Sequence, residues 1–352
     1  MMRGLIQRTY MTLMSLICIL LSSCEHRELT DNHAVQYVRV YLDEEIKNIT
    51  CGIYNEALEC PGYASPITLR AVLASPETGK VMYESFLRGH GSDDRGCYIE
   101  GYMGAVPGEY NFMVYSFGSP VTLIKDTDNY HKMTAYTKSV GERALSYLPV
   151  IRLKIDESTI MTEPEHMLWN SCERVRVSRS MALDTLRNSE GEYFTACSIA
   201  KSYYLQLNIK GVQWVHAATG VLSGIAGSAS MCMRDGYLYG DPANLFFYMK
   251  YADKKYRAED NTSTATLYTT FTTFGKIPDQ TSELALNFEF IKKDGSSQVE
   301  VIDITDAFDT PLAREKQWIL LDKEITIQAP SGTGGMFPGV EDWNNIDADI
   351  EM

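Results

Sequence analysis

The sequence predicts an all-β protein built as two successive antiparallel β-sandwiches. Short runs that alternate apolar and polar residues recur along the chain, with turn residues between them, and helical periodicity is almost absent. Tyrosine outnumbers phenylalanine by 22 to 12, and together with plentiful threonine and valine this favours sheets. A mature chain of roughly 330 residues is long enough for two domains. We expect them over residues 35–185 and 190–352.

The predicted strands of the first sandwich follow from period-two alternation. In the first of them, Val38, Val40 and Leu42 alternate with larger polar or aromatic residues. The set covers residues 37–42, 67–73, 81–87, 97–103, 110–114 and 167–177. Residues 126–149 are expected to form a long excursion with some local structure. The polar segment 178–193 is the best candidate for an interdomain linker.

The second sandwich shows the cleanest alternation in the chain, at Leu284, Leu286, Phe288 and Phe290. Its predicted strands cover residues 203–209, 212–222, 245–251, 264–274, 284–291, 299–304 and 318–327. The sequence Lys293-Asp294-Gly295-Ser296 predicts a hairpin turn, because Asp-Gly suits positive φ. One helical turn is expected near residues 305–308.

The first 23 residues have the features of a secretory signal peptide. Arg3 and Arg8 precede an uncharged apolar run from Met11 to Leu21. This run is about half the ~20 residues that a membrane-spanning helix needs. We therefore expect residues 1–23 to be removed from the mature protein.

The stretch Leu21-Ser22-Ser23-Cys24 resembles the bacterial lipobox, in which the chain is cleaved before an acylated cysteine. We expect Cys24 to carry lipid such as palmitate and to anchor the chain in the cell outer membrane, exposed at the surface. Residues 24–34 would form the lipidated tether. The alternative is a soluble secreted protein with a chance cysteine at this position.

The charge of the chain argues against nucleic acid as a partner. The formal net charge is −14, and removal of the signal peptide, which contains two arginines and no acids, makes it −16. Phosphate backbones would repel such a protein, and the sequence has no cluster of lysine and arginine to overcome that repulsion.

Six cysteines remain beyond Cys18, which leaves with the signal, and Cys24. No Cys-x-x-Cys pair and no histidine at metal-ligand spacing accompanies them, so no zinc site is expected. Cys51 and Cys60 flank a short loop and form the one pair that we would test as a disulfide. The alternative is that all six are free, mostly buried thiols.

Motifs that carry catalysis are missing from the sequence. It contains no Gly-x-Ser-x-Gly elbow, no phosphate-binding glycine-rich loop and no His-Glu-x-x-His, and its six histidines are scattered. We therefore predict no enzymatic activity, no cofactor and no metal site.

Several motifs resemble lipoproteins of the Bacteroidota fimbrillin superfamily, including fimbrial anchor and accessory subunits. At the C-terminus this similarity covers residues 334–343, with Ile346 and Asp347. Near the N-terminus it covers residues 24–29 and Val38-Arg39-Val40. Between them lie the matching segments 222–227, 273–275 and 303–306.

The resemblance implies two tandem transthyretin-like β-sandwiches and a role in cell adhesion through a fimbria or pilus. Polymerising members of this superfamily lose an N-terminal strand after an arginine. Arg39 lies inside the first predicted strand, and Arg27 is too near the lipid to release a complete strand. The resemblance thus implies a non-polymerising anchor or accessory subunit that contacts other fimbrial subunits by strand addition.

A second function class is a surface lipoprotein that binds host or microbial glycans through an aromatic platform. The tyrosine-rich composition is compatible with it. Coplanar exposed tyrosine or tryptophan side chains would favour this alternative, whereas a strand that pairs with an open sheet edge would favour the fimbrial one.

Overall fold

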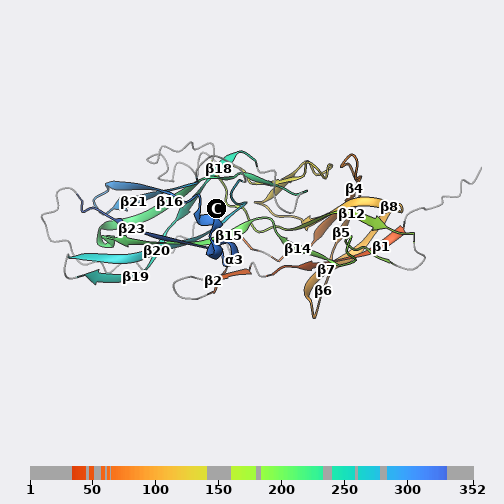
Figure 1. The fold of residues 1–352 in the computed structure, drawn as a ribbon, viewed down its shortest axis with the longest axis horizontal. Coiled ribbons are helices and arrows are strands. Elements are labelled where there is room, and N and C mark those ends of the chain that lie inside the picture. The colour runs from red at the N-terminus through yellow and green to blue at the C-terminus, as the bar shows by residue number, and fades with distance from the viewer. Residues whose placement is uncertain are drawn as a thin grey trace, which may run out of the picture.

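A computed structural model describes residues 34–44, 47–50, 57–59, 62–63, 65–140, 160–179, 184–232, 240–257, 261–277 and 284–330. Strands dominate these residues, so the all-β prediction is confirmed. Figure 1 shows two groups of strands side by side along the long axis, with the N-terminal strands in one and the C-terminal strands in the other. The described residues contain no helix long and apolar enough to cross a membrane.

The first group is a nine-stranded sheet with the order β5-β4-β8-β12-β14-β1-β7-β6, and β13 pairs with β1 beside this path. Strand β5 also contacts β7, so the sheet closes on itself around a core. Its strands are β1 (Ala34–Leu42), β4 (Leu69–Ala74), β5 (Val81–Leu87), β6 (Gly89–Asp93), β7 (Gly96–Ala105), β8 (Gly108–Ser116), β12 (Leu168–Val177), β13 (Asp184–Thr185) and β14 (Phe194–Ser198).

The alternation of apolar and polar residues along the strands explains which side chains form the core of the first group. Val38 and Val40 of β1 are fully buried with Leu73, Phe112 and Phe194 in one hydrophobic cluster. The residues between them in β1 face outward, as period two requires. The predicted first strand and its buried face are confirmed.

The second group consists of a five-stranded and a four-stranded sheet, with the orders β11-β18-β16-β21-β22 and β19-β20-β15-β23. Phe271 of β20 stacks on Phe247 of β18 at 5.4 Å, so the two sheets face each other across a packed core. The strands are β11 (Ile160–Met161), β15 (Lys201–Lys210), β16 (Val215–Ala226), β18 (Pro242–Tyr248), β19 (Lys250–Arg257), β20 (Thr262–Thr273), β21 (Ala285–Lys292), β22 (Ser297–Asp303) and β23 (Trp318–Thr326).

Two predicted strands of this group differ from the structure. The prediction over 245–251 joined two strands, because β18 and β19 belong to different sheets and the chain changes sheet at Met249, whose amide donates to the Ala218 carbonyl. The strand predicted from Val212 instead begins with a 3₁₀ turn, η4 (Val212–Trp214). Gly211 precedes it with φ 89°, and a Cβ there would meet the Ile327 carbonyl at 2.5 Å.

The turns of the second group follow the predictions more closely. β21 and β22 pair without a register shift, and Gly295 between them has φ 81°, as the Asp-Gly turn requires. The expected helical turn appears as η5 (Ala307–Asp309), followed by the short α3 (Pro311–Glu315).

The predicted excursion supplies the contact between the two groups. Its strand β10 (Thr134–Tyr136) pairs with β17 (Ser228–Ser230) of the second group and, on the other side, with β9 (Leu123–Lys125), which comes just before the excursion. Tyr130 and Met133 are buried there in a hydrophobic cluster that includes Tyr115 and Trp169 of the first group and most of the second group's core. The larger core therefore runs across the boundary between the groups.

The segment predicted as a linker is partly paired with the first sheet. Asp184 and Thr185 form β13 against β1, and the Leu186 amide donates to the Tyr37 carbonyl at 2.8 Å. The chain then enters β14 and passes into β15 of the second group only after Ser198. Hydrogen bonding to an open flank of β1 is what holds this polar segment in the first group. The division into domains at 185 and 190 remains a prediction.

Candidate interaction surface

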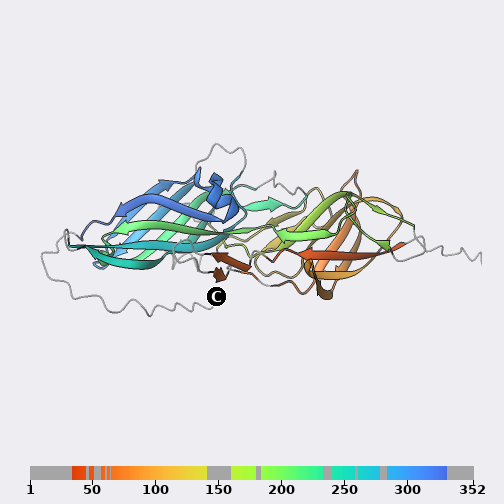
Figure 2. The same cartoon turned by 60° about the horizontal axis from the view of Figure 1, so that its bottom comes forward.

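Strand β1 lies inside the first sheet, with partners on both sides. It pairs with β7 in an unbroken antiparallel register from Ala34 opposite Ala105 to Tyr41 opposite Tyr98. On its other side it pairs in parallel with β13 and β14. The strand runs from the outer end of the first group toward the second group (Figure 2). Its removal would open a slot in the middle of the sheet.

Arg39 occupies the outward face of β1 and is held by several side chains. One guanidinium nitrogen lies 3.2 Å from Asp93, another lies 2.9 Å from Glu100, and the group stacks 3.8 Å from the centre of the Tyr98 ring. The Tyr37 hydroxyl donates to Glu100. Burial, followed by this bond to Glu100, raises the pKa of Tyr37. Arg39 is thus fixed in the middle of a paired strand.

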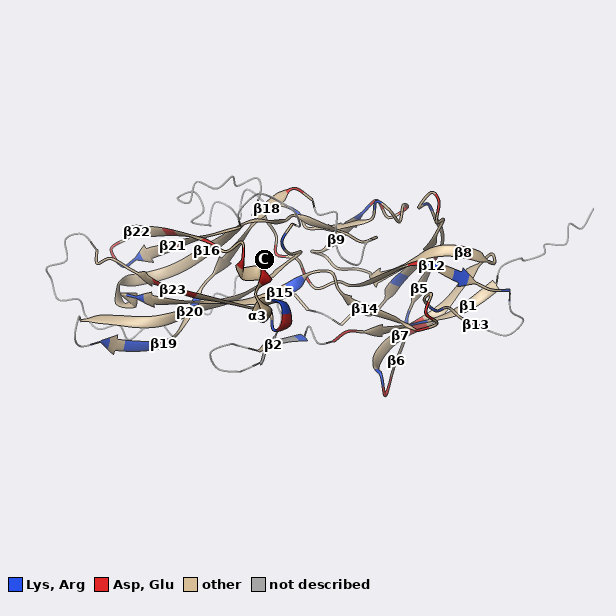
Figure 3. Ribbon diagram, in the orientation of Figure 1, with Lys and Arg blue, Asp and Glu red and all other residues tan. Residues whose placement is uncertain are grey.

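The edges of the second group differ in how they are protected. Strand β19 carries Lys250, Lys254, Lys255 and Arg257, and its register with β20 shifts between Ala252 and Lys255. Figure 3 shows these basic positions along its length. Positive charge and a bulge are the features that prevent an edge strand from accepting another strand.

Strand β22 lacks those protections. It pairs regularly with β21 over seven residues, and it contains no lysine, arginine or proline. Val299 is 42% exposed and Val301 is 58% exposed on one face of this edge. Among the described edges, a regular strand with exposed valines is the type most suited to pairing with an extended segment of another chain.

A hairpin from the first part of the chain straps the two groups together. β2 (Asn48–Thr50) and β3 (Ala57–Glu59) pair with each other and lie close to the second group (Figure 2). Ile49 is buried among Tyr63, Tyr204, Tyr268 and Trp318, and the indole of Trp318 donates to the Thr50 carbonyl.

The predicted site residues Cys24, Cys51 and Cys60 lie outside the described residues. Lipidation of Cys24 and a disulfide between Cys51 and Cys60 therefore stay predictions. The four described cysteines, Cys97, Cys172, Cys197 and Cys232, form no disulfide.

A buried polar network joins the two groups and was not foreseen from the sequence. His166, which precedes β12, has Nδ1 2.7 Å from the Ser198 hydroxyl and Nε2 2.7 Å from the Ser202 hydroxyl. Ser202 continues to the Thr272 hydroxyl at 2.6 Å, and the Thr272 amide donates to Glu163 at 2.6 Å. Only tertiary contact brings these five residues together.

Burial shifts both titratable groups of this network toward their neutral forms. The pKa of Glu163 rises from 4.5 to about 7, and that of His166 falls from 6.5 to about 4. His166, Ser202 and Thr272 are buried, and Glu163 and Ser198 are partly buried, so this network has the geometry of a structural contact between the two groups. Within the described residues, no group of three or more acidic, histidine or cysteine side chains could hold a metal ion.

The chain is similar to one family model over part of its length and to one fimbrial protein over nearly all of it. A family model described as "Domain of unknown function (DUF5119)" matches residues 88–248. The chain is 21% identical over 351 residues to "Putative fimbrium anchoring subunit Fim4B" of Bacteroides ovatus, covering 94% of this chain and 93% of that protein. The predicted resemblance to fimbrial anchor proteins is confirmed.

One solved structure supports the same fold. The chain superposes on a crystal structure titled "putative adhesin" from Bacteroides ovatus with a TM-score of 0.55 at 18% identity, covering 87% of this chain and 97% of that one. It also matches the fimbrial anchor protein Mfa2 from Porphyromonas gingivalis with a TM-score of 0.45 at 10% identity, covering 83% and 91% of the two chains.

Proposed function

We propose that this protein is a cell-surface lipoprotein that acts as a non-polymerising anchor or accessory subunit of a fimbria. The homologue named as a fimbrium anchoring subunit supports this role over nearly the whole chain. The structural observation that carries it is the position of β1, which is paired on both flanks and contains Arg39. Cleavage after Arg39 would cut through a paired strand, so we infer that the mature protein keeps β1.

Lipid on Cys24 would hold the chain at the outer membrane. Residues 25–33 could extend at most about 35 Å between the lipid and the start of β1. Because β1 starts at the outer end of the first group, the second group would point away from the membrane (Figure 1). Such a short tether suits the base of a fimbria better than its shaft. We further propose that the two groups of strands are two tandem sandwich domains.

The partner surface of this anchor would be the β22 edge in the second group. The regular register of β22 leaves backbone donors and acceptors on its outer flank, and Val299 and Val301 offer apolar contacts to alternate side chains of an added strand. This proposal names fimbrial subunits as the partners that add the strand.

N-terminal processing tests the anchor role directly. The protein would be extracted from the surface of its native cells, and its N-terminus would be determined by mass spectrometry. We expect a lipidated N-terminus at Cys24. A mature chain that begins after Arg39 would overturn the proposal, because β1 would then be missing.

Pull-down of the lipidated protein from native cells tests the partner surface. We expect pilin-like chains to co-purify with the wild type and to be lost when Val299 and Val301 are both changed to lysine. The matched control is Tyr256→Lys, which adds a lysine at a 66% exposed position of the already basic edge strand β19. Equal recovery with both variants would show that β22 is not the docking edge.

The aromatic-platform alternative has no supporting ring geometry among the described residues. Pairs that include an exposed ring meet at steep angles: 57° for Tyr37 and Tyr102, 69° for Phe86 and Phe117, and 90° for Phe246 and Tyr248. A flat sugar ring needs a coplanar surface for stacking, and these pairs do not form one.

A further inference from the structure

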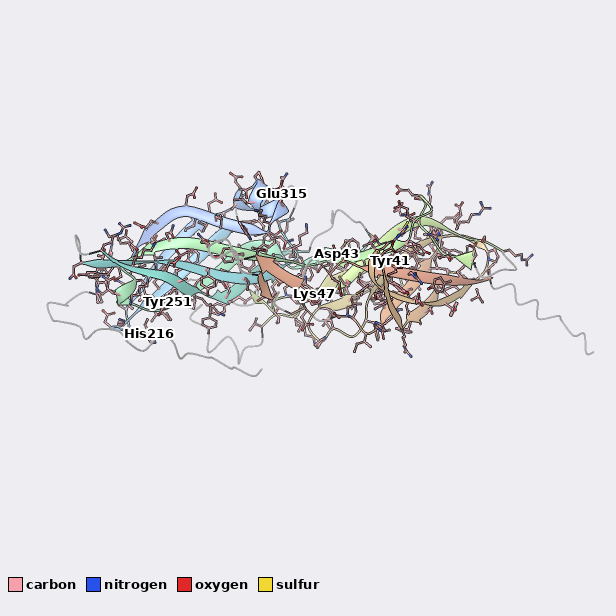
Figure 4. The ribbon with its side chains drawn as sticks, turned by 90° about the horizontal axis from the view of Figure 1, so that it is seen from below. Tyr41, Asp43, Lys47, His216, Tyr251 and Glu315 are labelled. Atoms are coloured by element: carbon pink, nitrogen blue, oxygen red, sulfur yellow. The ribbon has the colours of Figure 1, made fainter. Side chains whose placement is uncertain are left out.

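An open hollow of about 810 Å³ lies where β1 leaves the first sheet. Its walls come from the end of β1, the tip of the β6–β7 hairpin and the segment before β14. The lining residues are Tyr41, Leu42, Asp43, Glu44, Arg95, Glu192, Tyr193 and Thr195. Figure 4 shows Tyr41 and Asp43 on this face, with Lys47 farther toward the second group. This volume is in the range of sites that hold small ligands or one to two sugar rings.

Arginines gather around Tyr193 at this hollow. The Arg187 guanidinium stacks 3.9 Å from the centre of the Tyr193 ring, and that of Arg95 lies 5.7 Å from it. Among the described residues, neither Arg95 nor Arg187 is ion-paired, whereas Arg39 beside them is neutralised by Asp93 and Glu100. The stacked Arg187 also donates from one Nη to the Gly191 carbonyl at 3.3 Å, so the exposed guanidinium of Arg95 is the group that can pair with a carboxylate.

Acceptors for hydroxyl groups line the same hollow. Glu192 and Thr195 are exposed there, and Asp43 is half-buried. The charge of Glu44 is already balanced by Lys47 at 2.8 Å. A simple anion such as phosphate has too few O–H donors for these oxygens, whereas a sugar that carries one carboxylate also supplies several hydroxyl donors. A neutral sugar would leave the guanidinium of Arg95 without a partner.

We propose that this hollow binds a carboxylated saccharide. The ligand carboxylate pairs with Arg95, and ligand hydroxyls donate to Glu192 and Thr195. Arg187 acts as a positioning residue, because its stacking fixes the ring of Tyr193 at the wall. Recognition rests on hydrogen bonds and one ion pair rather than on stacking against flat aromatic rings. The site is separate from the β22 edge and does not depend on the anchor role.

Two sources carry this chemistry, namely sialic acid at the end of a host-type glycan and uronic acid in an acidic polysaccharide. Binding of the full lipidated protein, kept in detergent, would be measured by calorimetry against sialyllactose and against oligogalacturonate. Lactose and a neutral oligosaccharide serve as the uncharged probes. Binding to either acidic probe at least tenfold tighter than to its neutral counterpart supports the proposal and identifies the source.

Substitutions inside and outside the hollow test whether binding depends on these residues or only on the overall charge of the protein. We expect Arg95→Gln and Glu192→Ala each to weaken binding of the acidic probe about tenfold, the effect of losing one charge-assisted hydrogen bond. Arg88→Gln, at an exposed arginine on Phe86 of the same group, is the matched control and should bind like the wild type. Binding that is absent at millimolar concentrations, equal for neutral probes, or unchanged in both variants would overturn the proposal.

Discussion

The indole Nε1 of Trp169 donates to the Met231 carbonyl at 2.7 Å and links the two groups of strands inside a shared hydrophobic core. Trp169 belongs to β12 of the first sheet, whereas Met231 follows β17. Both residues are buried, so water cannot replace this bond. The contact shows that the larger core couples the two groups.

We expect the two groups to unfold in one cooperative transition, because Trp169 and its neighbours belong to a core that crosses the boundary. Trp169→Phe leaves the Met231 carbonyl buried without its donor and should lower the free energy of unfolding by about 1–3 kcal/mol. Chemical denaturation followed by circular dichroism measures both effects. Tyr256→Phe, at an exposed ring, is the control. Two separate transitions in the wild type would contradict the prediction.

Glu163 should make the protein less stable as the pH rises toward 8. Its folded pKa is raised from 4.5 to about 7, so the folded state binds its proton more tightly than the unfolded state does. The resulting stabilisation is fully present below pH 4.5 and is lost as the pH rises through 7, a change of about 3 kcal/mol. Glu163→Gln removes this dependence. Denaturation at pH 5 and pH 8 should show that the free energy of unfolding of the wild type falls between these two pH values. The variant should not show this fall.

His166 should give the opposite dependence in acid. Burial lowers its folded pKa to about 4, so the neutral ring favours the folded state above its unfolded pKa of 6.5. That stability is lost as the pH falls from 6.5 through 4, again by about 3 kcal/mol. His166→Gln should be less stable than the wild type at pH 7 but should lose less between pH 7 and pH 4. Equal losses in the two proteins would exclude this source of acid sensitivity.

The strap formed by β2 and β3 should open without unfolding the rest of the protein. Ile49 is 3% exposed and packs with Tyr63, which follows the strap, and with three aromatic side chains of the second group. Ile49→Ala removes most of this contact, a loss of about 2–4 kcal/mol for a buried isoleucine. Hydrogen exchange should become faster in peptides that cover residues 47–59 and stay unchanged in β20. Faster exchange throughout would show that the strap supports the whole fold.

The peptide bond after Arg39 should resist cleavage by trypsin in the native protein. A protease needs a locally extended and accessible segment, and β1 is hydrogen-bonded on both flanks around Arg39. Limited digestion should cut exposed sites such as Lys254 and Lys255 in β19 well before Arg39. Early release of a fragment that starts at Val40 would show that β1 leaves the sheet readily.

Much of the fold could be predicted because period-two alternation identifies a strand and its buried face. Val38 and Val40, or Phe288 and Phe290, are buried as their spacing indicates. The main error in the predicted strand bounds lies where the alternation of apolar residues continues while the chain moves from one sheet to another. At Met249 a mostly apolar run passes from one sheet to the other, and its alternation does not mark the change.

The interaction surfaces could be predicted only in part. Sequence showed that Arg39 lies within a strand, but not that Asp93 and Glu100 from two other strands hold it. The approach of His166, Ser202 and Thr272 likewise depends on three separate segments. Contacts between residues far apart in the chain leave no periodic signal, because each partner reads locally as an ordinary strand or loop residue.

The sequence by itself determined the all-β class, the order of most strands, the Asp-Gly hairpin and the expectation of a lipid at Cys24. These features depend on local periodicity, turn chemistry or a short motif. The tertiary structure alone decided that β1 is paired on both flanks, that β22 is an open edge while β19 is protected, and that one core crosses both groups. Those properties depend on which strands become neighbours, and that choice is made by long-range packing and hydrogen bonding.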